Sequence, residues 1–149
     1  YLSLPSSLIH GLQLVQNTVA RVVSHTSRIL YVTPIPKFFH WLKISERIKY
    51  KTLSFIYSAI HFNQPVYLRS LISMQSTRFT RSSSFVTLSR LPVTSRLKIA
   101  DCSLSNFVPQ LWNSHPARMR QPSQSSTSLS TESFHRHLKT YRFTLSYPP

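Results

Sequence analysis

The chain has 149 residues, and its 18 Lys and Arg residues stand against 3 acidic residues, which gives a formal net charge of +15. Most cationic side chains therefore lack an intramolecular partner, and we expect them to be solvated or to face a polyanion, of which nucleic acid is the commonest. With Gly11 as the single glycine and Cys102 as the single cysteine, the composition argues against Gly-rich phosphate loops and excludes internal disulfides and cysteine-based zinc sites.

The segment over residues 6–24 is predicted to be an amphipathic helix in which Ser6 or Ser7 supplies the N-cap. Its apolar positions fall on one helical stripe: Leu8, Leu12, Val15, Val19, Val22 and Val23. Pro34 and Pro36 then predict an extended segment, because the residue before a proline disfavours the helical conformation.

A second helix is predicted to open at Ile44, Ser45 and Glu46 and to end near His61. Ser45 is the expected N-cap, and Glu46 suits the positive end of the helix dipole. The first two turns of this helix carry a basic face: Arg47, Lys49 and Lys51. Pro65 suits the first position of a third, short helix, where an N–H group would be unpaired in any case.

The middle of the chain is expected to hold a short β segment over residues 75–100, with strands at 85–88 and 97–99. Asp101 can cap a helical turn that leads to Phe107, and Pro109 interrupts or restarts this helix. Two residues that follow are expected in the core: Leu111 and Trp112.

A flexible Ser- and Gln-rich linker is predicted over residues 117–130, and a final helix starts at Thr131. On one side of this helix the residues that line up are Phe134, Leu138 and Tyr141 or Arg142. Its basic side is formed by Arg136, Lys139 and Arg142. The expected fold class is therefore mostly α, with about four helices and one or two short strands in the middle. We expect a helical region over residues 1–116, the linker, and a C-terminal helix and tail over residues 131–149.

Groups that could carry catalysis are few. The three carboxylates, of Glu46, Asp101 and Glu132, all stand where a helix cap or a first helical turn explains them. Two-metal polymerase chemistry needs clustered aspartates, and Asp101 has no acidic neighbour. The seven histidines lack the spacing that brings two metal ligands together on a helix, and no serine has the flanking glycines of a nucleophile elbow. We therefore expect no enzymatic activity, metal site, cofactor or small-molecule ligand.

The basic residues remain as the candidate binding site. We expect contact with the backbone of RNA or DNA, without sequence selectivity. The residues expected to make it are Arg47, Lys49, Lys51, Arg78, Arg81, Arg96 and Lys98. An aromatic segment between Lys37 and Lys43 offers faces on which bases stack, although we expect Phe39, Trp41 and Leu42 to belong to the core.

Membrane association is not expected from the sequence. No apolar run approaches the roughly 20 residues that a spanning helix needs. The first nine residues lack the charged segment and apolar run of a signal peptide. We expect an intracellular location, in the cytoplasm or the nucleus.

Several short stretches follow one another in the order of a known family. The matching positions are residues 12–17, Ala20, Arg21, Thr33, Pro34, 40–42, Arg47, Ile48 and Lys51, then Tyr57, His61, Pro65, Tyr67, Leu68 and Leu71, then 81–83, Pro109, 111–113 and Pro116, and finally Phe134, Arg136, 138–140 and Phe143. In this order they resemble the segments LQxVQNxAAR, TP…LHWLPVxxRIxFK, YKxLHxxxPxYLxxLL, LRSS, APxLWNxLP and FxxxLKTxLF. These segments belong to the region after the polymerase core in LINE-type, non-LTR retrotransposon reverse transcriptases of the jockey-like group.

The resemblance implies the thumb-like helices and C-terminal tail that help to hold template and primer in these RNA-directed DNA polymerases. The palm, with its metal-binding aspartates, would lie upstream. Residues 42–44 lack the family's proline and residues 100–110 lack its glycine and arginine, which indicates a diverged or degenerate copy. We expect a palm-less fragment that binds nucleic acid non-specifically. The alternatives are a non-functional product of a transposon remnant and, third, an independent enzyme.

Overall fold

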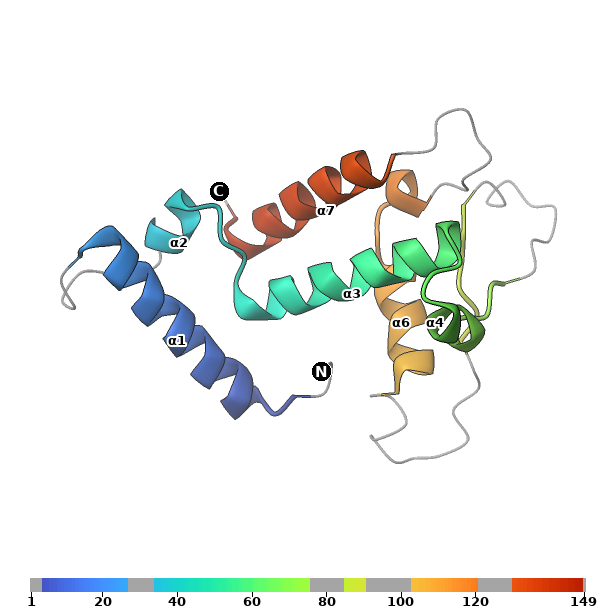
Figure 1. The fold of residues 1–149 in the computed structure, drawn as a ribbon, viewed down its shortest axis with the longest axis horizontal. Coiled ribbons are helices and arrows are strands. Elements are labelled where there is room, and N and C mark those ends of the chain that lie inside the picture. The colour runs from blue at the N-terminus through green and yellow to red at the C-terminus, as the bar shows by residue number, and fades with distance from the viewer. Residues whose placement is uncertain (1–3, 27–33, 76–84, 91–102, 121–129, 149) are drawn as a thin grey trace. The chain divides into compact units, whose positions relative to one another are not determined.

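A computed structural model describes residues 4–26, 34–75, 85–90, 103–120 and 130–148. The elements in these ranges are α1 (Ser6–Ser24), α2 (Pro34–Phe38), α3 (Ile44–His61), α4 (Val66–Leu71), α6 (Leu104–Asn113), the 3-10 helix η1 (Ala117–Arg120) and α7 (Thr131–Ser146) (Figure 1). The expected mostly α-helical fold class is confirmed for this part of the chain. More helices are present there than the four or so that we expected, because α2 is helical and α6 continues through Pro109.

The chain forms two compact units. Unit 1 consists of residues 1–50 and 137–149, and unit 2 consists of residues 51–136. Helices α3 and α7 each contribute residues to both units, which no local sequence pattern indicates. The division at 116 and 130 stays a prediction; of the expected linker, residues 117–120 form η1, and residues 121–129 lie outside the described ranges.

Helix α1 of unit 1 has the predicted bounds but not the predicted cap. It begins after Pro5, and no side chain caps its N-terminus, so neither Ser6 nor Ser7 is an N-cap. At the other end His25 adopts a left-handed conformation, with φ 51°, and the helix ends there. The apolar and polar periodicity that predicts a helix is therefore sufficient to place α1 along the sequence.

The face of α1 that the protein buries is polar rather than apolar. Gln16 and Ala20 are buried, and the Gln16 Nε2 group donates to the carbonyl of Leu42 over 2.9 Å. Gln13 Oε1 accepts from the backbone N–H of Ile44 over 3.0 Å. The apolar stripe is 46–68% exposed: Leu8, Leu12, Val15, Val19, Val22 and Val23. An amphipathic helix normally buries its apolar stripe, and α1 instead uses glutamine hydrogen bonds to hold the start of α3.

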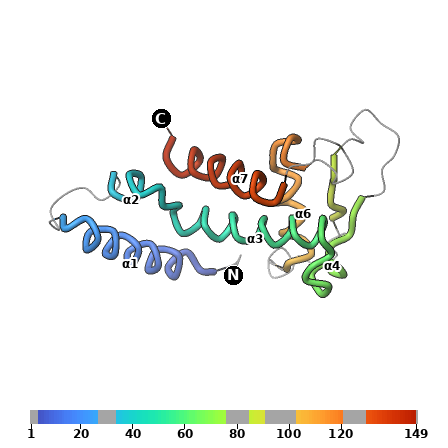
Figure 2. The backbone as a smooth tube through the Cα atoms, turned by 45° about the horizontal axis from the view of Figure 1, so that its top comes forward, coloured from blue at the N-terminus to red at the C-terminus, as the bar shows by residue number. Residues whose placement is uncertain are grey.

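Helix α2 corrects the expectation of an extended segment. Pro34 occupies its first position and Pro36 its first turn, where a missing N–H breaks no intrahelical hydrogen bond. Figure 2 shows α2 beside α1 in unit 1, and the two helices are in contact. Trp41 N donates to Pro36 O over 2.9 Å after α2, and His40 takes a positive φ of 53° there.

In each unit a part of α3 packs against a part of α7. In unit 1, Arg142 of α7 forms an ion pair with Glu46 of α3, and Leu138 is completely buried. In unit 2, the rings of Tyr57 and Phe134 stack with centroids 3.8 Å apart, and both residues are buried. Helix α3 starts at Ile44, so Ser45 lies inside it and is not its N-cap.

The core of unit 2 is built around α6. Leu111 and Trp112 are buried as predicted. Val108 and the ring of Pro109 are buried with them, and this packing retains a helix that lacks one hydrogen bond at the proline. Its N-cap position is Ser103, while Asp101, the expected cap, lies outside the described residues.

The expected strand at 85–88 is reduced to one antiparallel bridge between Met74 and Leu88. Backbone hydrogen bonds flank the bridge, from Gln75 N to Thr87 O over 2.9 Å and from Ser89 N to Ser73 O over 2.8 Å, and side chains of α6 add further bonds. Asn113 accepts from the Leu88 N–H over 3.1 Å and donates to the Leu88 carbonyl over 2.9 Å. Trp112 Nε1 donates to the Val86 carbonyl over 3.0 Å. The other expected strand, at 97–99, lies outside the described residues.

Helix α7 starts at Thr131 as predicted, and Ser130 Oγ accepts the N–H of Ser133 at its first turn. The predicted buried side is confirmed for Phe134 and Leu138. None of the helices that the structure describes combines the length and the apolar character needed to cross a membrane.

Candidate nucleic-acid interface

Three of the seven predicted binding residues lie in the described part of the chain, all of them on α3. Arg47 and Lys49 belong to unit 1, and Lys51 belongs to unit 2. The other four lie outside the described residues: Arg78, Arg81, Arg96 and Lys98. In the described part of the chain, the candidate interface therefore consists of the cations of α3 and the other cations of unit 1.

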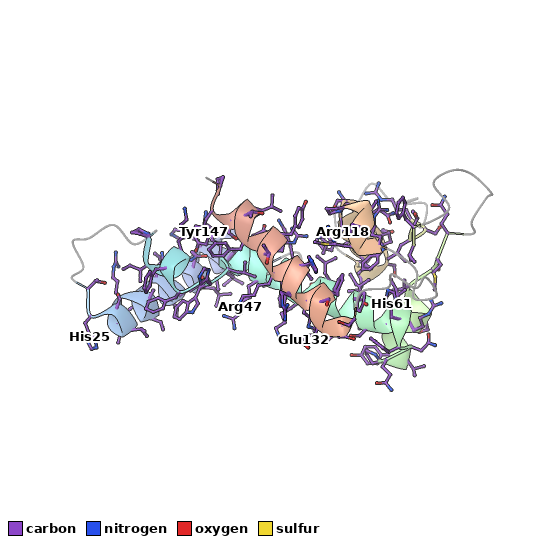
Figure 3. All side chains as sticks on the ribbon, turned by 90° about the horizontal axis from the view of Figure 1, so that it is seen from above. His25, Arg47, His61, Arg118, Glu132 and Tyr147 are labelled. Carbon is purple, nitrogen blue, oxygen red and sulfur yellow. The ribbon has the colours of Figure 1, made fainter. Side chains whose placement is uncertain are left out.

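The three α3 cations differ in how much of their charge is available to a ligand. Arg47 and Lys51 are exposed, and the side chain of neither has a hydrogen bond or an ion pair with another described residue. Figure 3 shows the Arg47 side chain extending away from α3. Lys49 Nζ lies 2.7 Å from Glu46 Oε1, and its side chain is 39% exposed. Arg47 and Lys51 can therefore contact a phosphate directly, whereas Lys49 already has a partner.

In unit 1 the carboxylate of Glu46 forms ion pairs with two cations, Lys49 and Arg142. Its Oε1 atom accepts from Lys49, and its Oε2 atom accepts from Arg142 Nη1 over 3.0 Å. The Glu46 side chain is 12% exposed and that of Arg142 is 5% exposed. Both oxygens of the Glu46 carboxylate therefore accept a charge-assisted hydrogen bond from a cation.

This arrangement decides between two predictions from the sequence. The sequence places Arg142 on the basic side of α7 with Arg136 and Lys139, or in line with Phe134 and Leu138, and the structure buries it. Residues 46 and 142 are separated by 96 positions, so no local pattern reveals their pairing. Arg136 and Lys139 are exposed as expected, and Arg136 lies 3.6 Å from Glu132 in an exposed pair.

Cations exceed carboxylate partners in the described part of the chain. Ion pairs engage three of its Lys and Arg residues: Lys49, Arg136 and Arg142. Two further arginines donate to neutral oxygens. Arg69 donates to the side-chain oxygen of Asn63 and to the Ile72 carbonyl, and Arg120 donates to the His115 carbonyl. The exposed cations without such a bond inside the described ranges are Lys37, Lys43, Arg47, Lys51, Arg90, Arg118 and Lys139.

The aromatic segment in unit 1 is only partly a core. Leu42 is buried as expected, whereas Phe39 and Trp41 are half-buried and Phe38 is 80% exposed. The ring centroids of Phe38 and Phe39 are 5.5 Å apart at 77°, and those of Phe39 and Trp41 are 5.6 Å apart at 34°. One aromatic ring therefore extends into solvent from a supported cluster.

The end of the chain adds a cation–π contact to unit 1. Lys43 Nζ lies 5.4 Å from the centroid of the Tyr147 ring. Tyr147 is 9% exposed, and burial raises the pKa of its hydroxyl above the ordinary value. Its ring packs on Phe143, which in turn contacts the ring of His40. These contacts position Lys43 without neutralising its charge.

A hollow of about 560 Å³ lies at the C-terminal end of α1 in unit 1. Its lining includes Thr18, Arg21, Val22, His25 and Thr26. The Arg21 Nε atom is buried and has no hydrogen-bond partner among the described residues.

Unit 2 contains two titratable groups whose pKa values are shifted by burial. The ring of His61 lies 4.2 Å from that of Tyr57, and burial lowers the pKa of His61. Burial also raises the pKa of the Tyr57 hydroxyl. In the described residues no group of three His, Cys, Asp or Glu side chains is placed to hold a metal ion. Desolvation is the cause of both pKa shifts.

No protein-family model, no curated protein and no solved structure matches this chain.

Proposed function

We propose that this chain is a part of a LINE-type reverse transcriptase outside the catalytic palm and that it binds the phosphate backbone of RNA or DNA without base selection. The observation that carries the binding proposal is the excess of exposed cations over carboxylates. Only three described cations have a carboxylate partner, and exposed cations without one occur in both units. Unneutralised cations attract a polyanion and release its counterions. The family assignment rests on the ordered sequence resemblance.

A salt titration of binding tests the proposal. The affinity of the full chain for a fluorescent single-stranded RNA and a DNA of the same length would be measured by anisotropy between 50 and 200 mM KCl, a range over which phosphate contacts are strongly attenuated. Each phosphate contact contributes about −0.7 to the slope of log K against log salt on a single strand. Absent binding, or binding that does not change with salt, would contradict the proposal.

Charge-removal variants locate the contacts. Arg47→Gln and Lys51→Gln, each made alone, are expected to reduce the size of the slope by about 0.7. Lys49→Gln is the matched control, because it removes the same charge from the same helix but from a side chain that Glu46 already holds. We expect Lys49→Gln to change the slope less than either of the other two variants.

The alternative is that the chain has no function and is the product of a transposon remnant. The exposed apolar stripe of α1 favours this alternative, because a large exposed apolar surface is uncommon in proteins that natural selection maintains. Cooperative unfolding of the purified chain would count against this alternative, and a broad, non-cooperative transition would support it.

A further inference from the structure

We infer that Phe38 is a stacking platform for an unpaired nucleobase, so that unit 1 prefers single-stranded RNA or DNA to a duplex. This inference rests on the proposed function and specifies its ligand. Phe38 ends α2 and is 80% exposed, more than any other large hydrophobic residue of the described ranges. A ring so exposed contributes little to the core, and its burial against a ligand is correspondingly favourable.

The ring is supported on one side and open elsewhere. Phe39 contacts Phe38 at a near-perpendicular angle of 77° with centroids 5.5 Å apart. Phe39 is itself fixed by Trp41, which is half-buried. A side chain held by a neighbouring ring loses less conformational freedom when a base stacks on it than an isolated one does.

The charges beside this ring match the ligand. Lys37 precedes Phe38 directly, and Lys43 follows it by five residues; both are exposed. Neither has a carboxylate partner among the described residues. Glu46, the described carboxylate of unit 1, is neutralised by Lys49 and Arg142. Cations beside an exposed aromatic ring, without free acids, provide both phosphate contacts and a stacking face.

Stacking distinguishes single strands from duplexes, whereas phosphate contact does not. A base in a duplex is already stacked within the helix, and a side chain reaches its face only after the base is unstacked. A single strand presents its bases without that cost. The cations of the site can therefore bind a single strand or a duplex, whereas Phe38 can stack only on a base of a single strand.

The experiment compares variants on matched ligands. Binding of a labelled single-stranded oligonucleotide and of the duplex of the same length is measured for the full chain at one salt concentration. We expect Phe38→Ala to weaken single-strand binding by about 5- to 150-fold, the usual effect of losing one base stack, and to leave duplex binding unchanged. Phe38→Tyr retains a stacking ring and is expected to retain single-strand binding, whereas Lys37→Gln should weaken both complexes.

Phe62→Ala is the matched control. Phe62 is also an exposed phenylalanine, at 53%, but residues 58–67 contain no Lys or Arg. Its removal should leave both affinities unchanged. If the chain binds and Phe38→Ala weakens neither complex, or both equally, the stacking inference is wrong while the proposed function stands. If neither ligand binds the unaltered chain, the proposed function fails and the stacking inference fails with it.

Discussion

Replacing Glu46 by glutamine tests how unit 1 is held together. Glu46 forms an ion pair with Arg142, whose side chain is 5% exposed, so its removal takes away the carboxylate that pairs with this buried guanidinium. Removing one partner of a buried ion pair costs about 3–5 kcal/mol. Because Glu46 keeps 12% exposure and glutamine keeps an oxygen acceptor, we expect the lower end, about 3 kcal/mol of unfolding free energy.

The assay is urea unfolding followed by far-ultraviolet circular dichroism. With a slope of about 2 kcal/mol per molar urea, Glu46→Gln should lower the midpoint by about 1.5 M. Glu132→Gln is the control, because Glu132 also lies in the first turn of a helix but pairs with Arg136 at 3.6 Å, with both side chains exposed. That variant should cost about 1 kcal/mol or less. Equal midpoints for the two variants would refute the reasoning.

Three further predictions concern single side chains. Asn113→Ala removes both hydrogen bonds to the backbone of Leu88 and should cost about 2 kcal/mol in urea unfolding; an unchanged midpoint would show that the segment is held otherwise. Gly11→Ala should raise stability by about 0.5–1 kcal/mol in a thermal melt, because Gly11 lies in α1 and a Cβ there meets nothing within 4 Å; destabilisation would show an unseen contact. Because burial lowers the pKa of His61, the unfolded state binds its proton more readily, and stability should fall as pH drops below the ordinary value of 6.5. His61→Phe keeps a ring beside Tyr57 and should reduce this loss in urea titrations at several pH values, and an identical pH profile would contradict the assignment.

The positions of the helices along the chain could be predicted, and so could the buried residues of α6 and α7, but not the buried face of α1. Helix α1 occupies residues 6–24 as its periodicity indicates, and α3 and α7 begin at or near the expected residues. Periodicity reports which positions share a face, and it does not report which neighbour will cover that face. In α1 the buried face is the one whose glutamines reach Leu42 and Ile44, contacts that depend on residues some 26–31 positions away.

The positive charge of the candidate site could be predicted from the sequence, but not all of the residues that form the site. Net charge indicated a polyanion ligand, and Arg47 and Lys51 are exposed on α3 as the pattern suggested. The exposure of Phe38 could not be predicted, because Phe38 and Phe39 are the same residue type and only packing leaves Phe38 exposed and Phe39 half-buried. The burial of Arg142 had no local signal either, since its partner is contributed by another helix.

Each compact unit contains one of the two tryptophans of the chain, with Trp41 in unit 1 and Trp112 in unit 2. Trp41 is half-buried, and Trp112 is 1% exposed. The two indoles therefore experience different polarity, and each reports on its own unit. In Trp41→Phe and Trp112→Phe variants the remaining fluorescence would follow the unfolding of one unit at a time, so the chain carries its own probes for deciding whether its two units unfold together or in sequence.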